Sequence, residues 1–334
     1  MGKGTIHSFS EGGIAGTHLT LPGLPVYVSP TTADDRNRIT AAVFPIACWS
    51  VSDVRFAFDS SVLSPEVADE VAHLKSLREQ HKRVIGGSAS TGKAGVSIYP
   101  PLSIFGHADP VGDDDYNKTL SGRRATAVYA LLTRKTALWE KLYSQPFGGD
   151  RWDGQAIDLM LDATSASGTA SVSKQQALDS AGSRATLFQA YMDQIAGDLK
   201  VDVNDDFLAA GADAGGKGDY QGCGEFNPLL LFSQAEQDEF EQPENKDERD
   251  DENAPNRRVL VLLFRPGSRI VAAKWPCPRA TEGVAGCRKR FWSDGEARRS
   301  KLLPDDRRLF PDTADTFACR FYQRFAVRGD QSYE

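Results

Sequence analysis

The sequence lacks any run of about 18 consecutive apolar residues, the length that a membrane-spanning helix needs. Its opening residues, MGKGTIHSFSEGGIAGTHLTL, include no apolar core of the kind found in secretory signal peptides and no cleavage site for one. We therefore expect a protein that is made in the cytoplasm and has no transmembrane segment. Either the start of the sequence is incomplete, or the protein leaves the cell by a route other than an ordinary signal peptide.

Patterns that carry catalysis or bind metals are also missing. The histidines form no H-E-x-x-H spacing, no G-x-S-x-G turn occurs, and no cysteine belongs to a C-x-x-C pair. Carboxylate pairs are plentiful, but the densest group lies in Glu236–Asn253, which we expect to be a solvated, partly disordered loop. The segment Gly87–Lys93 resembles the start of a phosphate-binding loop, but Ala94 replaces the hydroxyl residue that would bind magnesium. We expect no enzyme, no cofactor and no metal.

Excess basic charge is absent as well. The chain has 39 Lys and Arg against 46 Asp and Glu, a net charge of −7 at pH 7. Nucleic-acid-binding domains are usually basic, so we expect no nucleic-acid partner. Basic and aromatic residues do gather near the C-terminus, as in Cys287–Trp292. We favour a layer that packs on the rest of the protein. A surface for an acidic partner or for nucleic-acid bases is the alternative.

The five cysteines leave two interpretations open. A Cys277–Cys287 disulfide would staple a loop-rich C-terminal segment. The alternative is five reduced thiols in small apolar pockets, since buried thiols behave as small hydrophobic groups. The odd number means that at least one cysteine is reduced or pairs between chains. Their residue numbers are Cys48, Cys223, Cys277, Cys287 and Cys319.

What the chain does have is ordinary material for a folded protein. Hydrophobic residues make up 40% and charged residues 25% of its 334 positions, which is typical of a soluble globular protein. The length indicates two or three domains, or one domain with large insertions.

Two segments in the first half have the period of strands and helices. Val54–Asp59 alternates apolar and polar residues, which predicts a half-buried strand. Ser64 followed by Pro65 is a typical helix start, and apolar residues at helical spacing extend this helix to about His81. Residues 86–100 are rich in Gly and Ser and predict a loop. Further helices are predicted at 137–143, 154–161 and 185–195.

A strand and a helix in the middle of the chain place two charged residues near each other. Leu102–Phe105 predicts a strand, and Asp113–Asp115 predict the start of a helix that runs to about Leu132. Asp109 then lies just past the strand, and Arg124 lies within the helix. A late apolar run, Arg257–Phe264, predicts a strand buried on both faces. This order of elements favours helices packed on one face of a sheet.

An aspartate and an arginine in this arrangement could bind a small zwitterion. The guanidinium is a planar fork that accepts a carboxylate in bidentate fashion, and the aspartate attracts an ammonium group. Such charge-assisted bonds contribute roughly 1.5–3 kcal/mol each. The alternative is that Asp109 caps the helix and Arg124 forms a surface ion pair.

Four short blocks, in order along the chain, resemble the OmpA-like domain, a family of non-covalent peptidoglycan-binding modules. Phe56–Ser60 is similar to the F-x-F-D-S of its opening strand, and Asn117–Ala125 to its N-x-x-L-S-x-x-R-A helix. Gly222–Pro228 resembles its G-x-G-E turn, and Asn256–Val259 its N-R-R-V strand. The fifteen-residue spacing of Asp109 and Arg124 also fits the family pattern.

The resemblance implies an α/β fold, specifically an α+β sandwich with a β-α-β-α-β core. It also implies that Asp109 and Arg124 hold the diaminopimelate of the peptidoglycan stem peptide, with Asp59 and Asn117 near the site. Ala108 departs from the family, where many members have Thr. A second departure is the stretch of about 85 residues before the G-x-G-E turn, where the family has a short connection.

The predicted organisation follows from that interruption. The OmpA-like domain is split by a helical insertion and extended at both ends, the C-terminal extension carrying cysteines. The predicted parts are an N-terminal arm at 1–50, the domain's first part at 51–133, the insertion at 134–217, the domain's second part with the acidic loop at 218–266, and the C-terminal extension at 267–334.

The resemblance implies a protein that binds peptidoglycan without catalysis and anchors an assembly at the cell wall. We expect it in the cell envelope, the periplasm or outside the cell, reached by a route without a signal peptide. The chain is also similar in a general way, though in no particular motif, to proteins that accompany type VI secretion or contractile injection machinery. Partners from such machinery are therefore a hypothesis. Two alternatives stay open: a wall-degrading enzyme or secreted effector that uses the domain for targeting, and a scaffold that kept the fold without the ligand.

Overall fold

The computed structural model describes most of the chain between residues 27 and 309. The described residues are 27–29, 38–40, 45–56, 59–86, 95–169, 172–210, 219–226, 228–271, 282–290 and 305–309. The phosphate-loop-like segment 87–93, Cys277 and Cys319 lie outside them.

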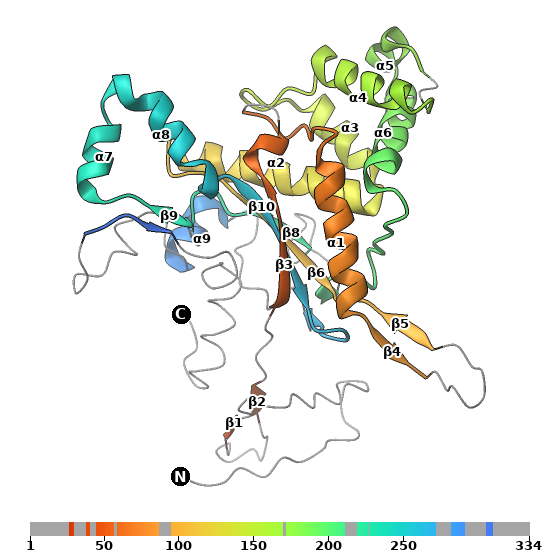
Figure 1. Cartoon of the computed structure of the whole chain (residues 1–334), viewed down its shortest axis with the longest axis horizontal. Coiled ribbons are helices and arrows are strands. Elements are labelled where there is room, and N and C mark those ends of the chain that lie inside the picture. Colours follow the sequence, from red (N-terminus) through yellow and green to blue (C-terminus); the bar gives the residue numbers. More distant parts are fainter. Residues whose placement is uncertain are drawn as a thin grey trace.

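A four-stranded sheet forms the centre of the fold, as predicted for an α/β protein (Figure 1). Its strands lie in the order β3 (Pro45–Ser52), β10 (Arg258–Phe264), β6 (Leu102–His107) and β8 (Tyr220–Gly222). β10 is antiparallel to both of its neighbours, and β8 is parallel to β6. β10 is buried along its whole length, which confirms the strand predicted from its apolar run.

Two helices cover one face of this sheet. α1 (Val67–His81) packs on β3, and α2 (Asp114–Thr133) packs on β6 and β8. Successive side chains of a strand point to opposite faces of the sheet. Every second residue of a strand therefore points toward the helices and packs with them in an apolar core. The core includes Trp49, Val51, Leu74, Ile104, Val128, Leu131, Val259 and Val261.

The start of α2 agrees with the sequence, and the start of α1 does not. Asp113 caps α2, where its side chain accepts a hydrogen bond from the backbone N–H of Tyr116 at 2.9 Å. α1 was predicted to begin at Pro65 with Ser64 as its cap. It begins instead at Val67, and the preceding Glu66 is its N-cap and forms no side-chain capping bond. The first turn is held by backbone bonds, such as that from Val67 N–H to the Ser64 carbonyl at 3.2 Å.

The prediction of a strand at Val54–Asp59 is wrong. The strand that pairs with β10 is β3, which ends at Ser52, and Asp53–Arg55 form a 3-10 turn. Phe56 makes only an isolated bridge to Leu63. The apolar residues Trp49 and Val51 of β3 are followed by Val54 and Phe56, so the alternation shifts by one position at the place where the chain turns. That turn is fixed by contacts with two distant arginines, described below.

The prediction of a partly disordered acidic loop at Glu236–Asn253 is also wrong. The segment forms α7 (Gln234–Phe240), α8 (Lys246–Glu252) and a 3-10 turn between them at Pro243–Asn245. Ser233 and Glu236 form a capping box at the start of α7, and Phe240 packs against Phe232. Arg307 pairs with both Glu236 and Glu252 at 2.7 Å. These contacts offset the repulsion that the composition alone indicates.

The described residues of the predicted insertion at 134–217 contain four helices. They are α3 (Thr136–Ser144), α4 (Gly154–Ala166), α5 (Lys174–Asp179) and α6 (Ala181–Ala196). Three correspond to predicted helices, and the short α5 was missed although Ser173 and Gln176 form a capping box at its start. Figure 1 shows the four together at one end of the molecule. Their aromatic cluster of Trp139, Trp152, Phe188 and Tyr191 joins the core of the sandwich.

The remaining elements are short. Part of the predicted loop at 86–100 is a strand, because β5 (Val96–Ile98) pairs with β4 (Arg83–Ile85) as a hairpin that projects from the body (Figure 1). The others are β1 (Tyr27–Ser29) with β2 (Arg38–Thr40), β7 (Ala209–Ala210) with β11 (Ile270–Val271), β9 (Leu230–Leu231) with β12 (Arg308–Leu309), the 3-10 turn Ala254–Asn256, and α9 (Gly283–Arg290). Within the described ranges no helix is long and apolar enough to cross a membrane.

Candidate functional site

Asp109 lies two residues beyond the end of β6, as the sequence predicts. The turn is held to the neighbouring segment by the Ala108 N–H, which donates to the Gly224 carbonyl at 2.8 Å. One Asp109 oxygen, Oδ1, accepts from the Val111 N–H at 3.0 Å, and the other, Oδ2, accepts from Arg257 Nη1 at 2.8 Å. Asp109 therefore does not cap α2, and that alternative interpretation of the residue is excluded.

Arg124 lies in the third turn of α2 and is buried, with 4% of its side chain exposed. Its Nε donates to the Ser60 carbonyl at 2.9 Å, and its guanidinium stacks 5.0 Å from the centre of the Phe56 ring. Nη1 lies 2.8 Å from Asp53 Oδ1 as an ion pair, although that oxygen accepts no hydrogen bond. Arg124 is therefore not part of a surface ion pair either.

Asp109 and Arg124 are connected through two other charged residues. Arg257 donates to Asp109 Oδ2 through Nη1 and to Asp53 Oδ2 through Nε, the latter at 2.7 Å. The result is a row of alternating charge: Asp109, Arg257, Asp53, Arg124. Burial lowers the pKa of Arg257, but its hydrogen bonds to Asp109 and Asp53 outweigh burial and raise that pKa above its ordinary value. The row holds two arginines and two aspartates, so their formal charges cancel.

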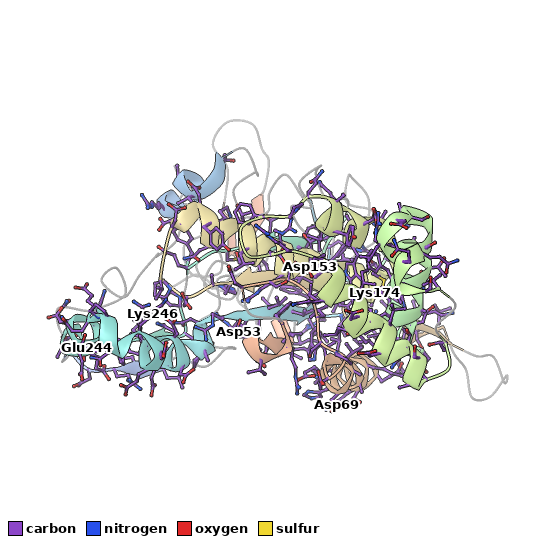
Figure 2. The ribbon with its side chains drawn as sticks, turned by 90° about the horizontal axis from the view of Figure 1, so that it is seen from above. Asp53, Asp69, Asp153, Lys174, Glu244 and Lys246 are labelled. Atoms are coloured by element: carbon purple, nitrogen blue, oxygen red, sulfur yellow. The ribbon has the colours of Figure 1, made fainter. Side chains whose placement is uncertain are left out.

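The row, which we call the charge row, is only partly exposed. The exposed fraction falls from 23% at Asp53 and 19% at Arg257 to 14% at Asp109. In Figure 2, Asp53 lies between α7 and α8 on one side and the helices of the predicted insertion on the other. A ligand that carries one carboxylate and one ammonium group could exchange for the inner Arg257–Asp53 pair without leaving any charge unpaired.

Sequence reasoning missed both inner members of the charge row. Arg257 belongs to the N-R-R-V block, so a signal for it was present. Asp53 belongs to none of the four blocks, and only its three-dimensional contacts reveal it. The two residues are 204 positions apart, a separation at which no local pattern operates.

Asn117 supports the turn that carries Asp109. Its Nδ2 donates to the Asp109 carbonyl at 3.2 Å and to the Val111 carbonyl at 3.0 Å. The residue is 6% exposed. Its observed contacts are with the backbone of this turn, so they keep the Asp109 carboxylate at the end of β6.

Asp59 contacts a different part of α2. Its Oδ1 accepts from the Tyr116 hydroxyl at 2.7 Å, and its own φ of 48° is unusual for a residue with a side chain. Burial first, and then Asp59, raise the pKa of Tyr116. Asp59 precedes Ser60, whose carbonyl binds Arg124, but no hydrogen bond described for Asp59 itself reaches the row of charged residues.

Glycines allow α2 to lie close enough to the sheet for Arg124 to reach Asp53. A Cβ at Gly106 would come within 2.0 Å of the Ser121 carbonyl oxygen, and one at Gly222 within 2.4 Å of the Gly122 backbone nitrogen. Ser121 adds a bond from its own side chain, which accepts from the Gly224 N–H at 2.8 Å. This close approach is why the G-x-G-E turn and α2 contact each other.

His107, at the end of β6, is buried. Its Nδ1 is 3.1 Å from the Phe226 carbonyl. Burial and the nearby Arg258 lower its pKa well below the ordinary value, so it is neutral at pH 7. Among the described residues no group of three His, Cys, Asp or Glu side chains is placed to hold a metal ion.

A cavity of about 770 Å³ borders the turn after Asp109. It opens between the starts of α2 and α9, and Arg288 pairs there with Asp114. Cys287 and Cys223 are both buried in this part of the fold, and burial raises the pKa of the Cys223 thiol to about 12. Cys277 lies outside the described residues, so the Cys277–Cys287 disulfide stays a prediction.

Comparison with known proteins finds a partial similarity to an outer membrane protein. The chain is 44% identical over 65 residues to outer membrane protein 41 of Porphyromonas gingivalis (strain ATCC BAA-308 / W83), a stretch that covers 17% of this chain and 17% of that protein. The chain thus matches less than a fifth of that relative's length. No family model matches the sequence, and no solved structure matches the fold.

Proposed function

We propose that this protein binds peptidoglycan without catalysis, through the diaminopimelate of the stem peptide. The observation that carries the proposal is the charge row, which places Asp109 and Arg124 at one end of the sheet with matched cations and anions between them. The similarity to an outer membrane protein supports a role in the cell envelope.

The binding mode follows from exchange of ion pairs. The side-chain carboxylate of diaminopimelate replaces Asp53 at Arg124, and its ammonium group replaces Arg257 at Asp109. Each new charge-assisted bond contributes roughly 1.5–3 kcal/mol, but the broken internal pairs offset much of this gain. We therefore expect weak binding of a single stem peptide. Many identical sites on one wall polymer then strengthen attachment of an assembly that carries several copies.

The protein anchors or targets a larger assembly to the wall. Type VI secretion or contractile injection machinery is the class of partner we propose. Co-purification with sheath, spike or baseplate components tests this part separately from the ligand site.

Calorimetric titration with the tripeptide L-Ala-D-Glu-meso-diaminopimelate tests the ligand. We expect binding that is lost in Arg124→Ala and in Asp109→Asn. The lysine-containing tripeptide lacks the second carboxylate and should bind at least about tenfold more weakly, the equivalent of 1.4 kcal/mol. Equal affinity for both tripeptides would contradict the proposed contact with Arg124.

A further inference from the structure

One turn of the helical insertion contacts the chain segment beside Arg124. Residues 147–150 form a tight turn in which Phe147 and Asp150 exchange backbone hydrogen bonds of 3.1 and 2.9 Å. The turn follows α3 and precedes α4, which begins after Asp153 (Figure 2). Asp150 is fully buried, with 0% of its surface exposed.

Four donors surround the Asp150 carboxylate, and three of them belong to Ser60 and Ser61. Oδ1 accepts from the Ser60 hydroxyl at 2.8 Å and from the Ser61 N–H at 2.7 Å. Oδ2 accepts from the Ser61 hydroxyl at 2.8 Å and from Arg123 Nε. A buried carboxylate needs such partners because desolvation of an unpaired charge costs several kcal/mol. Asp150 is therefore a fixed point to which the 60–61 segment is attached.

The same segment orients Arg124. The hydroxyl of Ser60 donates to Asp150, while its carbonyl accepts from Arg124 Nε at 2.9 Å. One residue thus connects the insertion with the guanidinium of the charge row. Arg123, the neighbour of Arg124 on α2, fixes the other side, because it donates to Asp150 and to the Leu142 and Gln145 carbonyls at the end of α3.

Two further contacts close this junction. Trp152 Nε1 donates to the Ser61 hydroxyl at 3.0 Å. Gly149 lies against Asp59 so closely that a Cβ there would come within 2.0 Å of Asp59 Oδ2, and its N–H donates to the Tyr116 hydroxyl at 3.3 Å. The insertion therefore holds the segment that begins at Asp59 with contacts from three of its own residues.

We propose that Asp150 is a positioning residue for ligand binding, through which the insertion holds Ser60 and thereby aims the Arg124 guanidinium at the ligand carboxylate. This inference rests on the proposed function. It gives the insertion a role in the affinity of the site, although none of its residues belongs to the charge row.

Asp150→Asn is the informative substitution because an amide cannot satisfy this site in either orientation. If the amide NH2 group takes the place of Oδ2, it faces another donor, Arg123 Nε. If it takes the place of Oδ1, it faces the Ser61 N–H, which is also a donor. Neither donor can turn away as a hydroxyl can. Ser60→Ala is a milder variant, which removes one donor and leaves the Ser60 carbonyl in place. Glu140→Gln is the matched control, because Glu140 pairs with Arg184 inside the insertion.

The first measurement is hydrogen exchange at Arg124 Nε by NMR, which needs no ligand. We expect exchange to be at least about tenfold faster in Asp150→Asn, intermediate in Ser60→Ala and unchanged in Glu140→Gln. If Asp150→Asn leaves this rate unchanged while lowering stability as Glu140→Gln does, Asp150 has a structural role only and the inference is wrong.

The second measurement is affinity for the diaminopimelate tripeptide in a double-mutant cycle with Arg124→Lys. Asp150→Asn should weaken binding about tenfold in the wild-type background and less than about twofold in the Arg124→Lys background, since non-additivity reports coupling. Equal losses in both backgrounds would refute action through Arg124. If the wild type does not bind the tripeptide while Arg124 exchange still responds to Asp150→Asn, the proposed ligand is wrong and the positioning of Arg124 stands.

Discussion

Asp53 occupies the position at Arg124 that the ligand carboxylate is expected to take, so removing its charge should strengthen binding. In Asp53→Asn, Arg257 keeps Asp109 as its partner, Arg124 loses its carboxylate within the charge row, and the formal charge of the row rises from 0 to +1. The oxygen that faces Arg124, Oδ1, accepts no hydrogen bond in the structure. Because this 2.8 Å ion pair lacks hydrogen-bond geometry, we expect it to be the contact of the charge row that a ligand displaces first.

The magnitude follows from the contacts that are lost. The hydrogen bond from Arg257 to Asp53 belongs to the class worth roughly 1.5–3 kcal/mol, and solvent reduces this value because the Asp53 side chain is 23% exposed. We expect Asp53→Asn to lower the free energy of unfolding by about 1–2 kcal/mol. Because Asp53 no longer competes for Arg124, we expect the variant to bind the diaminopimelate tripeptide about threefold to tenfold more tightly. A tenfold change in affinity corresponds to about 1.4 kcal/mol.

Urea denaturation and calorimetric titration, carried out on the same preparations, test this expectation. Asp109→Asn is the control, since it removes an equal charge from the outer end of the charge row and should weaken binding. A loss of affinity in Asp53→Asn, in parallel with its loss of stability, would show that Asp53 forms part of the binding surface and does not compete with the ligand.

Three further predictions concern residues around the site. Gly106→Ala should lower the free energy of unfolding by about 3 kcal/mol or more, because the new Cβ would lie 2.0 Å from the Ser121 carbonyl; a urea midpoint equal to that of the wild type would contradict the observed approach of α2. Cys223 should resist iodoacetamide at pH 8 in the folded protein, because burial raises its pKa to about 12, and react once the protein is unfolded; mass spectrometry of the native protein should find it unmodified. Burial raises the pKa of Asp219 from 3.8 to about 6, so its charged form destabilises the fold above pH 6, and Asp219→Asn should be more stable than the wild type at pH 7. That advantage should decline as the pH falls from 6 to 4, and an advantage that is constant with pH would exclude titration of Asp219 as its source.

The elements that the sequence predicts well are those whose signals are local. The buried strand β10 follows from a continuous apolar run, and α2 from acidic residues at its start and apolar residues at helical spacing. Asp109 and Arg124 lie where the predicted strand and helix place them. The mixed α/β class is confirmed on the same grounds.

Contacts between distant segments explain what the sequence did not reveal. The acidic segment is helical because Arg307, which lies beyond it in the chain, pairs with two of its glutamates. The chain turns at Asp53, where Arg124 and Arg257 bind it. The alternation of apolar residues shifts by one position there, but that shift does not reveal the two arginines that hold the turn. Asp150 is a single polar residue in a Gly-rich turn, and only folding brings it to Ser60. No periodicity or motif marks any of these pairs.

Co-sedimentation with purified peptidoglycan sacculi of the diaminopimelate type shows whether the protein binds the wall through Arg124. The comparison is between the wild type, Arg124→Ala and Arg78→Ala, because Arg78 is also buried in an ion pair but lies on α1 with Asp206 as its partner. We expect the wild type and Arg78→Ala to pellet with the sacculi and Arg124→Ala to stay in solution. If folded Arg124→Ala pellets to the same extent as the wild type, the protein does not bind the wall through Arg124.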